Sequence, residues 1–355
     1  MLQKYRLGGL YLAFVRSLLL SCCLLAVPAR ADIVPGLYAA VVPVAGQDTN
    51  SLARASREAL SIVLVKVSGS PQALDNPVIK DALGKARQYV QQYSYRREPE
   101  GGMAVRLEFD RNRVTSLVAE AGVPLWTANR PGVLVWMVLD SAEGTQFLGT
   151  ELTPEPALIL RAEFDRRGVP LRLPLLDLAD AAALSPTDVR RADVISLQAA
   201  SARYDLEHIV AGRLTQLSTG EYVGDWTYIH REQRLDRQVS AADLATAMRG
   251  GVDLAASAMA SRYAAAPLAT EGSGVLMSVS GVNDYSDYAA VVGWLQSLEL
   301  IDAARVERVQ GDRLELRLGA RAELAQLPAI IELNEGLQPA ELAQPGVQLS
   351  YQWLK

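Results

Sequence analysis

The fold is decided by an apolar stretch, VLVWMVL, at residues 133–139. Seven consecutive apolar residues predict a strand that is buried on both faces. Similar strands are predicted at residues 171–176 and 209–217, with helices over 154–167 and 185–204 between them. This alternation of strand and helix favours parallel pairing with right-handed crossovers. We therefore predict an α/β module with a partly parallel sheet.

The same module is predicted to continue with antiparallel strands. Residues 222–230 and 234–239 alternate as two such strands do, and a long helix is expected over 241–263. Gly250-Gly251 lies inside that helix and predicts a kink or a division. We assign residues 129–264 to this second module and residues 265–274, which are small and polar, to a linker.

A third module, residues 275–355, shows the order βαββαβ, which is typical of a ferredoxin-like fold. The turn between its middle strands is predicted at Gly311-Asp312. The first module, residues 32–128, combines a strand, two helices, a hairpin and a final helix. The hairpin is predicted from residues 93–97 and 103–109. The fold class is therefore α/β and α+β, in three small modules in series.

The N-terminal residues have the pattern of a secretory signal peptide. Lys4, Arg6 and Arg16 precede an apolar run over 18–27, and an A-x-A site follows at residues 29–31. This pattern predicts export to the periplasm and removal of residues 1–31, with no membrane span after cleavage.

Both cysteines, Cys22 and Cys23, lie within that segment and would leave with it. The mature chain would then have no thiol for a nucleophile, a disulfide or a zinc site. The residues before Cys22 also resemble a lipobox, so lipid anchoring at Cys22 is an alternative.

Composition bounds the partners. The chain has 355 residues and a formal net charge of −5, and removal of the four basic residues of the signal segment would make it more acidic. An acidic surface of mixed charge argues against nonspecific binding to nucleic acid or anionic lipid. We expect no nucleic-acid partner.

The motifs of common cofactor and hydrolase sites are missing. The sequence contains no phosphate-binding loop, no dinucleotide fingerprint after a strand, no G-x-S-x-G elbow and no H-E-x-x-H motif. The chain has two histidines, His208 and His230, and structural roles at a sheet edge are expected for both. We therefore predict no cofactor, and an enzyme is not the favoured class.

One constellation of carboxylates is a candidate site. Asp140 and Asp177 each follow a buried strand of the parallel part of the second module, and Asp180 lies nearby. Open parallel sheets bind ligands outside such strand ends, and two carboxylates there can hold a divalent cation. The alternative is that these acids cap helices and satisfy loop amides.

Two sets of side chains are candidates for an interaction patch. Trp126, Arg130 and Trp136 cluster at the junction of the first two modules, where they form either a docking patch or the contact between the modules.

The other set consists of Tyr93, Tyr95, Arg96 and Arg97 in the predicted hairpin. Aromatic and cationic side chains in this arrangement can stack on a sugar, but an exposed hairpin edge has the same composition.

Six strings, at residues 38–44, 59–69, 122–126, 130–131, 167–170 and 174–178, carry a resemblance to a family. Together they resemble an exported family of Gram-negative bacteria known as domain of unknown function 2066, which has no assigned activity. A second stretch, residues 200–214, is similar to the helix–strand step of periplasmic docking domains in envelope-assembly proteins. Those domains are not catalytic, so the second resemblance implies a docking role.

Two functions are compatible with the sequence. The first is a non-enzymatic periplasmic scaffold or adaptor that docks an envelope protein or peptidoglycan, with strand addition as one binding mode. The second is a carboxylate-based, metal-assisted hydrolase of a phosphate or glycan bond with its site at Asp140 and Asp177. The sequence identifies neither the partner nor the oligomeric state.

Overall fold

The structure is a computed structural model that describes residues 32–98, 101–149, 154–265, 274–334, 336–340 and 346–354. The predicted signal peptide, with Cys22 and Cys23, lies outside the described residues, as does most of the predicted linker. Helices and strands form several sheets, some with mixed parallel and antiparallel pairing. The predicted fold class, α/β and α+β in several modules, is confirmed.

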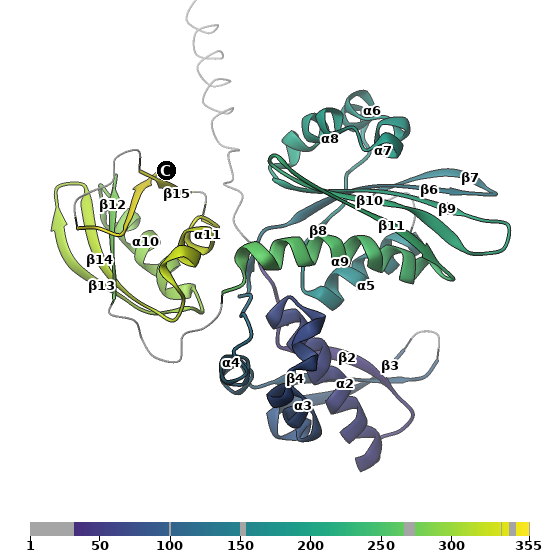
Figure 1. Cartoon of the computed structure of the whole chain (residues 1–355), viewed down its shortest axis with the longest axis horizontal. Coiled ribbons are helices and arrows are strands. Elements are labelled where there is room, and N and C mark those ends of the chain that lie inside the picture. Colours follow the sequence, from purple (N-terminus) through teal and green to yellow (C-terminus); the bar gives the residue numbers. More distant parts are fainter. Residues whose placement is uncertain are drawn as a thin grey trace, which may run out of the picture. The chain divides into compact units, whose positions relative to one another are not determined.

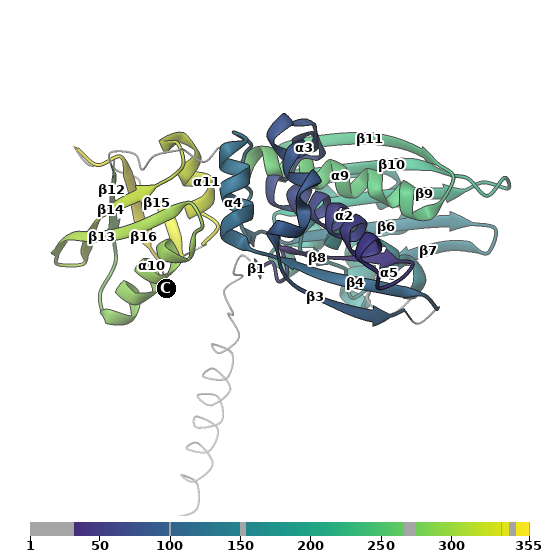
Figure 2. The same ribbon diagram turned by 90° about the horizontal axis from the view of Figure 1, so that it is seen from below.

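The first module contains a three-stranded antiparallel sheet in the order β2-β4-β3. Helix α2 packs an apolar stripe that includes Leu60 and Leu64 into the core beside this sheet (Figure 2). It begins after Asp48, whose carboxylate accepts from the backbone N–H groups of the first turn, and ends at Gly69. The elements are β2 (Ala39–Val44), α2 (Thr49–Ser68), η1 (Pro71–Asp75), α3 (Pro77–Gly84), η2 (Ala86–Tyr89), β3 (Val90–Arg97), β4 (Met103–Phe109) and α4 (Arg111–Glu120).

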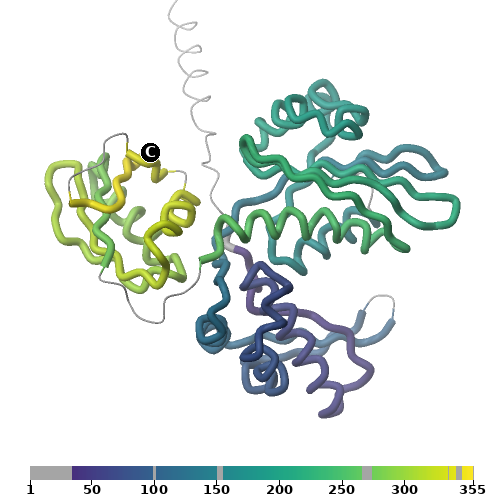
Figure 3. The backbone as a smooth tube through the Cα atoms, in the orientation of Figure 1, coloured from purple at the N-terminus to yellow at the C-terminus, as the bar shows by residue number. Residues whose placement is uncertain are grey.

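The second module contains a six-stranded sheet in the order β11-β10-β9-β6-β7, with β8 also paired to β6. The apolar stretch that decides the fold becomes β6, which pairs parallel to β8 and β9 and is buried on both faces. Figure 3 follows the chain through these strands. They are β6 (Val133–Ser141), β7 (Gly144–Leu148), β8 (Leu171–Arg172), β9 (His208–Gln216), β10 (Tyr222–His230) and β11 (Gln233–Ala241).

Helices cover this sheet on both faces (Figure 1). Helices α5 (Pro154–Arg167) and α9 (Leu244–Tyr263) lie on one face, where their apolar side chains share a core with the sheet. The opposite face is covered by shorter elements: α6 (Leu178–Ala183), α7 (Pro186–Arg191), α8 (Val194–Ser201) and η3 (Ala202–Tyr204).

Two expectations about these helices are wrong. The single helix expected over 185–204 is interrupted, because Ala192 adopts a left-handed conformation (φ 47°) and Asp193 caps the next helix. Helix α9 is continuous through Gly250-Gly251. At Gly251 a Cβ would lie 2.1 Å from the indole of Trp226, so this glycine makes room for a buried ring.

The third module contains a five-stranded sheet in the order β13-β14-β12-β16-β15. The predicted βαββαβ order is present with one added strand, β15, and β16 runs parallel to β12. The elements are β12 (Val275–Ser280), α10 (Tyr285–Ser297), β13 (Ile301–Gln310), β14 (Arg313–Ala320), η4 (Leu324–Gln326), α11 (Leu327–Ile331), β15 (Leu337–Pro339) and β16 (Leu349–Trp353).

A small ribbon outside these sheets pairs β1 (Asp32–Ile33) with β5 (Asn129–Arg130). Within the described ranges, no helix combines the length and the apolar character that a membrane crossing needs.

Candidate functional site

Asp140 lies within β6 and is held by an arginine from α7. Arg190 donates to both carboxylate oxygens, at 3.1 and 2.7 Å, and the hydroxyl of Thr145 donates to one of them at 2.6 Å. The hydrogen bonds from Arg190 hold the pKa of Asp140 below its usual value. This carboxylate is therefore ionised and already occupied by the chain's own donors.

Asp177 and Asp180 form a second cluster around a different arginine. Asp177 caps α6, and Arg203 donates to its two carboxylate oxygens at 2.6 and 2.9 Å. Asp180 is buried and accepts from Arg203, from the Tyr204 hydroxyl and from the backbone N–H of Leu176. The Arg203 guanidinium holds the pKa of Asp177 well below its usual range.

The predicted carboxylate site is thus divided between two arginines. Asp177 and Asp180 share Arg203, whereas Asp140 is paired with Arg190. Over the part of the chain that the structure describes, no group of three or more histidine, cysteine, aspartate or glutamate side chains is arranged to hold a metal ion. The metal-assisted site remains a prediction from the sequence, and no described contact favours it.

The first predicted patch lies in the interior. Trp126, Arg130 and Trp136 have no exposed surface, so their side chains cannot reach a partner in the folded chain. Of the two roles considered for this cluster, burial rules out an accessible docking patch. Trp136 donates from Nε1 to the hydroxyl of Ser201, which places it under α8.

Arg130 connects the first two modules through backbone carbonyl groups. It donates to the carbonyl of Lys66, near the end of α2, and to those of Arg167 and Gly168, where α5 ends. Its guanidinium lies 3.9 Å from the centroid of the Trp126 ring. Burial lowers the pKa of Arg130 to about 9, so the side chain remains charged at neutral pH. Two helix C-termini therefore supply the partial negative charge that stabilises it.

The contacts of Arg130 form a joint between the first two modules. A network of charged side chains between α5 and α9 extends this joint. Arg167, fully buried, donates to Asp253 of α9 and to the carbonyl of Gly69. Glu163 accepts from Arg249 of α9 and from Arg166. These contacts explain why arginine and glycine occur in the string at residues 167–170: they are structural.

Strand β3, by contrast, is exposed on most of its length. Tyr93 is 48% exposed, and its ring meets that of Tyr95 edge to face at 5.9 Å. Arg96 and Arg97 are also exposed, and Arg96 pairs with Glu98. These four residues are the part of the predicted patch that a partner can reach.

The outer edge of β3 also carries backbone groups that point away from β4. The N–H of Glu98 donates to the carbonyl of Gly102, on the side of β4. Backbone groups alternate in direction along an antiparallel strand, so Ser94 and Arg96 turn theirs toward β4. The groups of Tyr93, Tyr95 and Arg97 therefore face the open side, where no further strand is paired within the described part of the chain.

A cavity of about 490 Å³ was not predicted from the sequence. Segment 34–39 lines it with Arg111 and Glu299, among others. Glu299 accepts from the Tyr38 hydroxyl at 3.3 Å and lies 2.8 Å from a guanidinium nitrogen of Arg111. Burial raises the pKa of Glu299, and burial together with this carboxylate raises that of Tyr38. Glu299 lies in the turn between α10 and β13, so no sequence pattern marked it.

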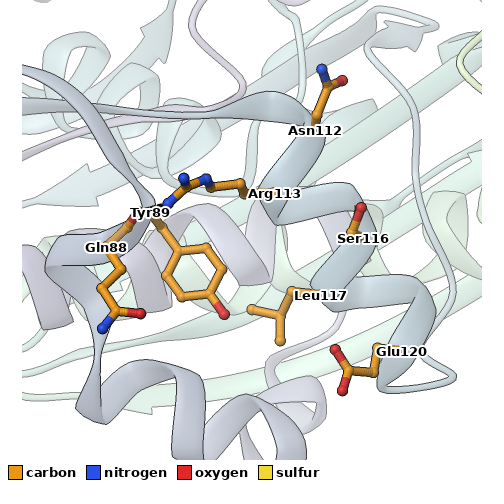
Figure 4. A pocket seen from close by; sticks show the side chains of 7 residues that line it. All are labelled: Gln88, Tyr89, Asn112, Arg113, Ser116, Leu117 and Glu120. Carbon is orange, nitrogen blue, oxygen red and sulfur yellow. Dashed lines mark hydrogen bonds between the residues drawn. The ribbon is translucent and has the colours of Figure 1, made fainter.

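A smaller cavity, about 380 Å³, lies between η2 and α4 (Figure 4). Tyr89 and Leu117 form its apolar part, whereas Ser116 and Glu120 are among its polar lining residues. Arg113 donates to the carbonyl of Gln88 and so spans from α4 to η2. The side chains are of mixed character and do not form a nucleophile with an adjacent base.

Comparison with known proteins adds one match. A family model for a domain of unknown function, DUF8605, matches residues 31–127, which is less than half of the chain. No curated protein matches the chain.

The resemblance to domain of unknown function 2066 is therefore wrong, because the family that matches the first module is a different one. The strings that carried the resemblance include the residues that build the joint around Arg130 and Arg167. The likeness to periplasmic docking domains has no support from a curated match.

Proposed function

We propose that this chain is a non-enzymatic periplasmic adaptor that binds an envelope protein, or cell-wall material, through the exposed side of β3. The observation that carries the proposal is the free backbone edge at Tyr93, Tyr95 and Arg97. An extended segment of a partner can add to such an edge, where main-chain hydrogen bonds supply affinity and alternate side chains supply specificity.

Two features support this assignment. The acidic groups that the sequence singled out are neutralised by arginines of the same chain, as at Asp140 and Asp177. The N-terminal pattern of basic residues, apolar run and A-x-A site is that of an exported protein. A docking role requires no nucleophile or cofactor, and none is predicted from the sequence.

The experiment is site-specific crosslinking in cells. A photoreactive amino acid is placed at Gln92 on β3 and, as a control on another outer strand, at Gln238 on β11. Both positions are exposed. We expect a discrete crosslinked product from Gln92 and none from Gln238.

A matched pair of variants then tests the binding mode. Tyr93→Pro removes an outward-facing N–H together with the ring, whereas Tyr93→Ala removes the ring alone. Strand addition predicts that only the proline variant abolishes the crosslink. Loss in both variants would indicate stacking on the ring, as expected for a glycan. Absence of any product from either strand, together with no enrichment of envelope protein or sacculus by the purified chain, would contradict the adaptor.

A further inference from the structure

Two buried imidazoles lie side by side where β9 begins and β10 ends. His208 and His230 are directly opposite each other in the antiparallel register, and each is only 2% exposed. Their rings stack with centroids 4.3 Å apart and planes 12° apart. A second charge in so small and dry a space would be strongly repelled.

Both ring nitrogens of His208 are hydrogen-bonded to phenols. Nδ1 lies 2.7 Å from the hydroxyl of Tyr228 and Nε2 lies 3.0 Å from that of Tyr263. A neutral imidazole has one donor and one acceptor nitrogen, so one phenol accepts and the other donates. Tyr263 is the last residue of α9. This hydrogen bond therefore ties the end of α9 to the sheet.

A proton added to His208 would break this arrangement. The imidazolium donates from both nitrogens, so the phenol that had donated loses its acceptor. Burial lowers the pKa of His208 to about 3, and the neighbouring His230 and Arg262 act in the same direction. No carboxylate contacts His208 among the residues that the structure describes.

His230 differs from His208 in having a carboxylate beside its ring. Its Nε2 lies 3.4 Å from a carboxylate oxygen of Glu207, which is also paired with Arg231 in the turn after β10. Burial and then Arg262 lower the pKa of His230, and Glu207 opposes them. The hydrogen bond to Glu207 raises the pKa of Arg231, and Glu332 of the third module acts in the same direction. On the other side, the apolar Val133 of β6 lies opposite His208.

We propose that His208 and His230 form an acid-sensitive lock that holds the end of α9 on the β9–β10 pair while both rings are neutral. Opening of this end hydrates the rings, which then take up protons from solvent with ordinary histidine pKa values near 6.5. Because the closed state binds these protons only at lower pH, it is favoured above about pH 6.5 and is lost as the pH falls.

The size of the effect follows from the linkage. At pH 5.5 an imidazole with a pKa near 6.5 is about nine-tenths protonated, so each ring shifts the opening equilibrium about tenfold. With both rings the local opening equilibrium increases by up to about 100-fold between pH 7.5 and 5.5. The lock is independent of the proposed function.

Hydrogen exchange of the full chain tests this lock. After correction for intrinsic exchange rates, peptides over the last turn of α9 should show the increase, whereas peptides from α2 should not. His230→Gln should reduce the pH effect to about tenfold, and the double variant with His208→Gln should abolish it. Unchanged protection of the α9 end in the wild type, or an unchanged pH effect in the double variant, overturns the proposal.

A second measurement covers variants that fail to fold. The chain contains two histidines, so an NMR titration of the folded wild type resolves each imidazole directly. Both should titrate below the ordinary value of about 6.5. Titration of either ring at or above that value overturns the proposal as well.

Discussion

The joint around Arg130 and the outer strand β3 differ in where their polar groups lie. At the joint, Arg130 is fully buried and donates to carbonyls at the ends of two helices. On β3, Tyr93, Arg96 and Arg97 are exposed. The outward backbone groups of Tyr93, Tyr95 and Arg97 have no partner strand among the described residues.

This difference distinguishes residues that stabilise the fold from residues that are accessible to a partner. A buried cation whose donors are all bonded within the chain cannot bind a ligand, even if its sequence context resembles a binding patch. A strand edge with unused main-chain groups adds little to the stability of the fold, but it is available to another chain. Substitutions should therefore have large effects on stability at the joint and small ones on β3.

The largest expected effect is that of Arg130→Met. The substitution keeps much of the side-chain volume but leaves the carbonyls of Lys66, Arg167 and Gly168 without their donor. Each buried acceptor that is left unsatisfied typically costs about 1–3 kcal/mol, so we expect a loss of about 3 kcal/mol or more. Urea denaturation followed by circular dichroism measures this change. A loss below about 1 kcal/mol would mean that the joint does not depend on this guanidinium.

The next effect is expected for Gly251→Ala in α9. The added Cβ would lie 2.1 Å from the Trp226 ring, which is fully buried and cannot move freely. Overpacking of this kind typically reduces stability by about 1–3 kcal/mol, although alanine has the higher helix propensity. Thermal unfolding gives the comparison, with Gly293→Ala of α10, where the Cβ meets nothing within 4 Å, as the control. Equal or higher stability of the Gly251 variant would contradict the close packing.

The sequence predicted the parts of this fold that depend on continuous local patterns. The apolar run at 133–139 became a strand buried on both faces, and the hairpin of β3 and β4 lies where alternation placed it. The division expected at Gly250-Gly251 does not occur, because both glycines make room for side chains of other elements. Val239 lies beside Gly250, and the ring of Trp226 lies beside Gly251. A local pattern cannot report a contact of that kind.

The candidate sites were harder to predict for the same reason. Asp140 lies near the end of β6 and Asp177 caps α6. The arginines that pair with them, Arg190 and Arg203, are distant in sequence. Trp126 and Arg130 have the composition of a docking patch, and only burial distinguishes them from one. Glu299 lies in a turn without any motif. Composition predicted which residues are unusual, but not which of them face solvent.

A smaller effect, about 1 kcal/mol, is expected for Glu163→Gln, and it should depend on pH. Burial opposes ionisation of Glu163, but hydrogen bonds from Arg249 and Arg166 outweigh it and hold the pKa of Glu163 below its usual value. Its contribution is therefore present above the unfolded pKa, near 4.3, and is lost as the pH falls through the lower folded value.

The measurement is the free energy of unfolding of both proteins between pH 7 and pH 3. The wild type should lose its advantage over Glu163→Gln at the acidic end, so that the two curves converge. Parallel curves over this range would show that the carboxylate charge does not stabilise the contact between α5 and α9.

The smallest loss of stability is expected for a proline on β3, and it should depend on which of two adjacent positions is substituted. Tyr93→Pro removes an N–H that faces the open edge, so the loss of stability should be about 1 kcal/mol or less, most of it from the ring. Ser94→Pro removes an N–H that faces β4 and should cost more, about 1–3 kcal/mol, because a ladder hydrogen bond is lost. Thermal unfolding of the two variants compares adjacent residues of one strand. If both were equally destabilising, the backbone groups of Tyr93 would be in use within the chain, and the edge would not be free for a partner.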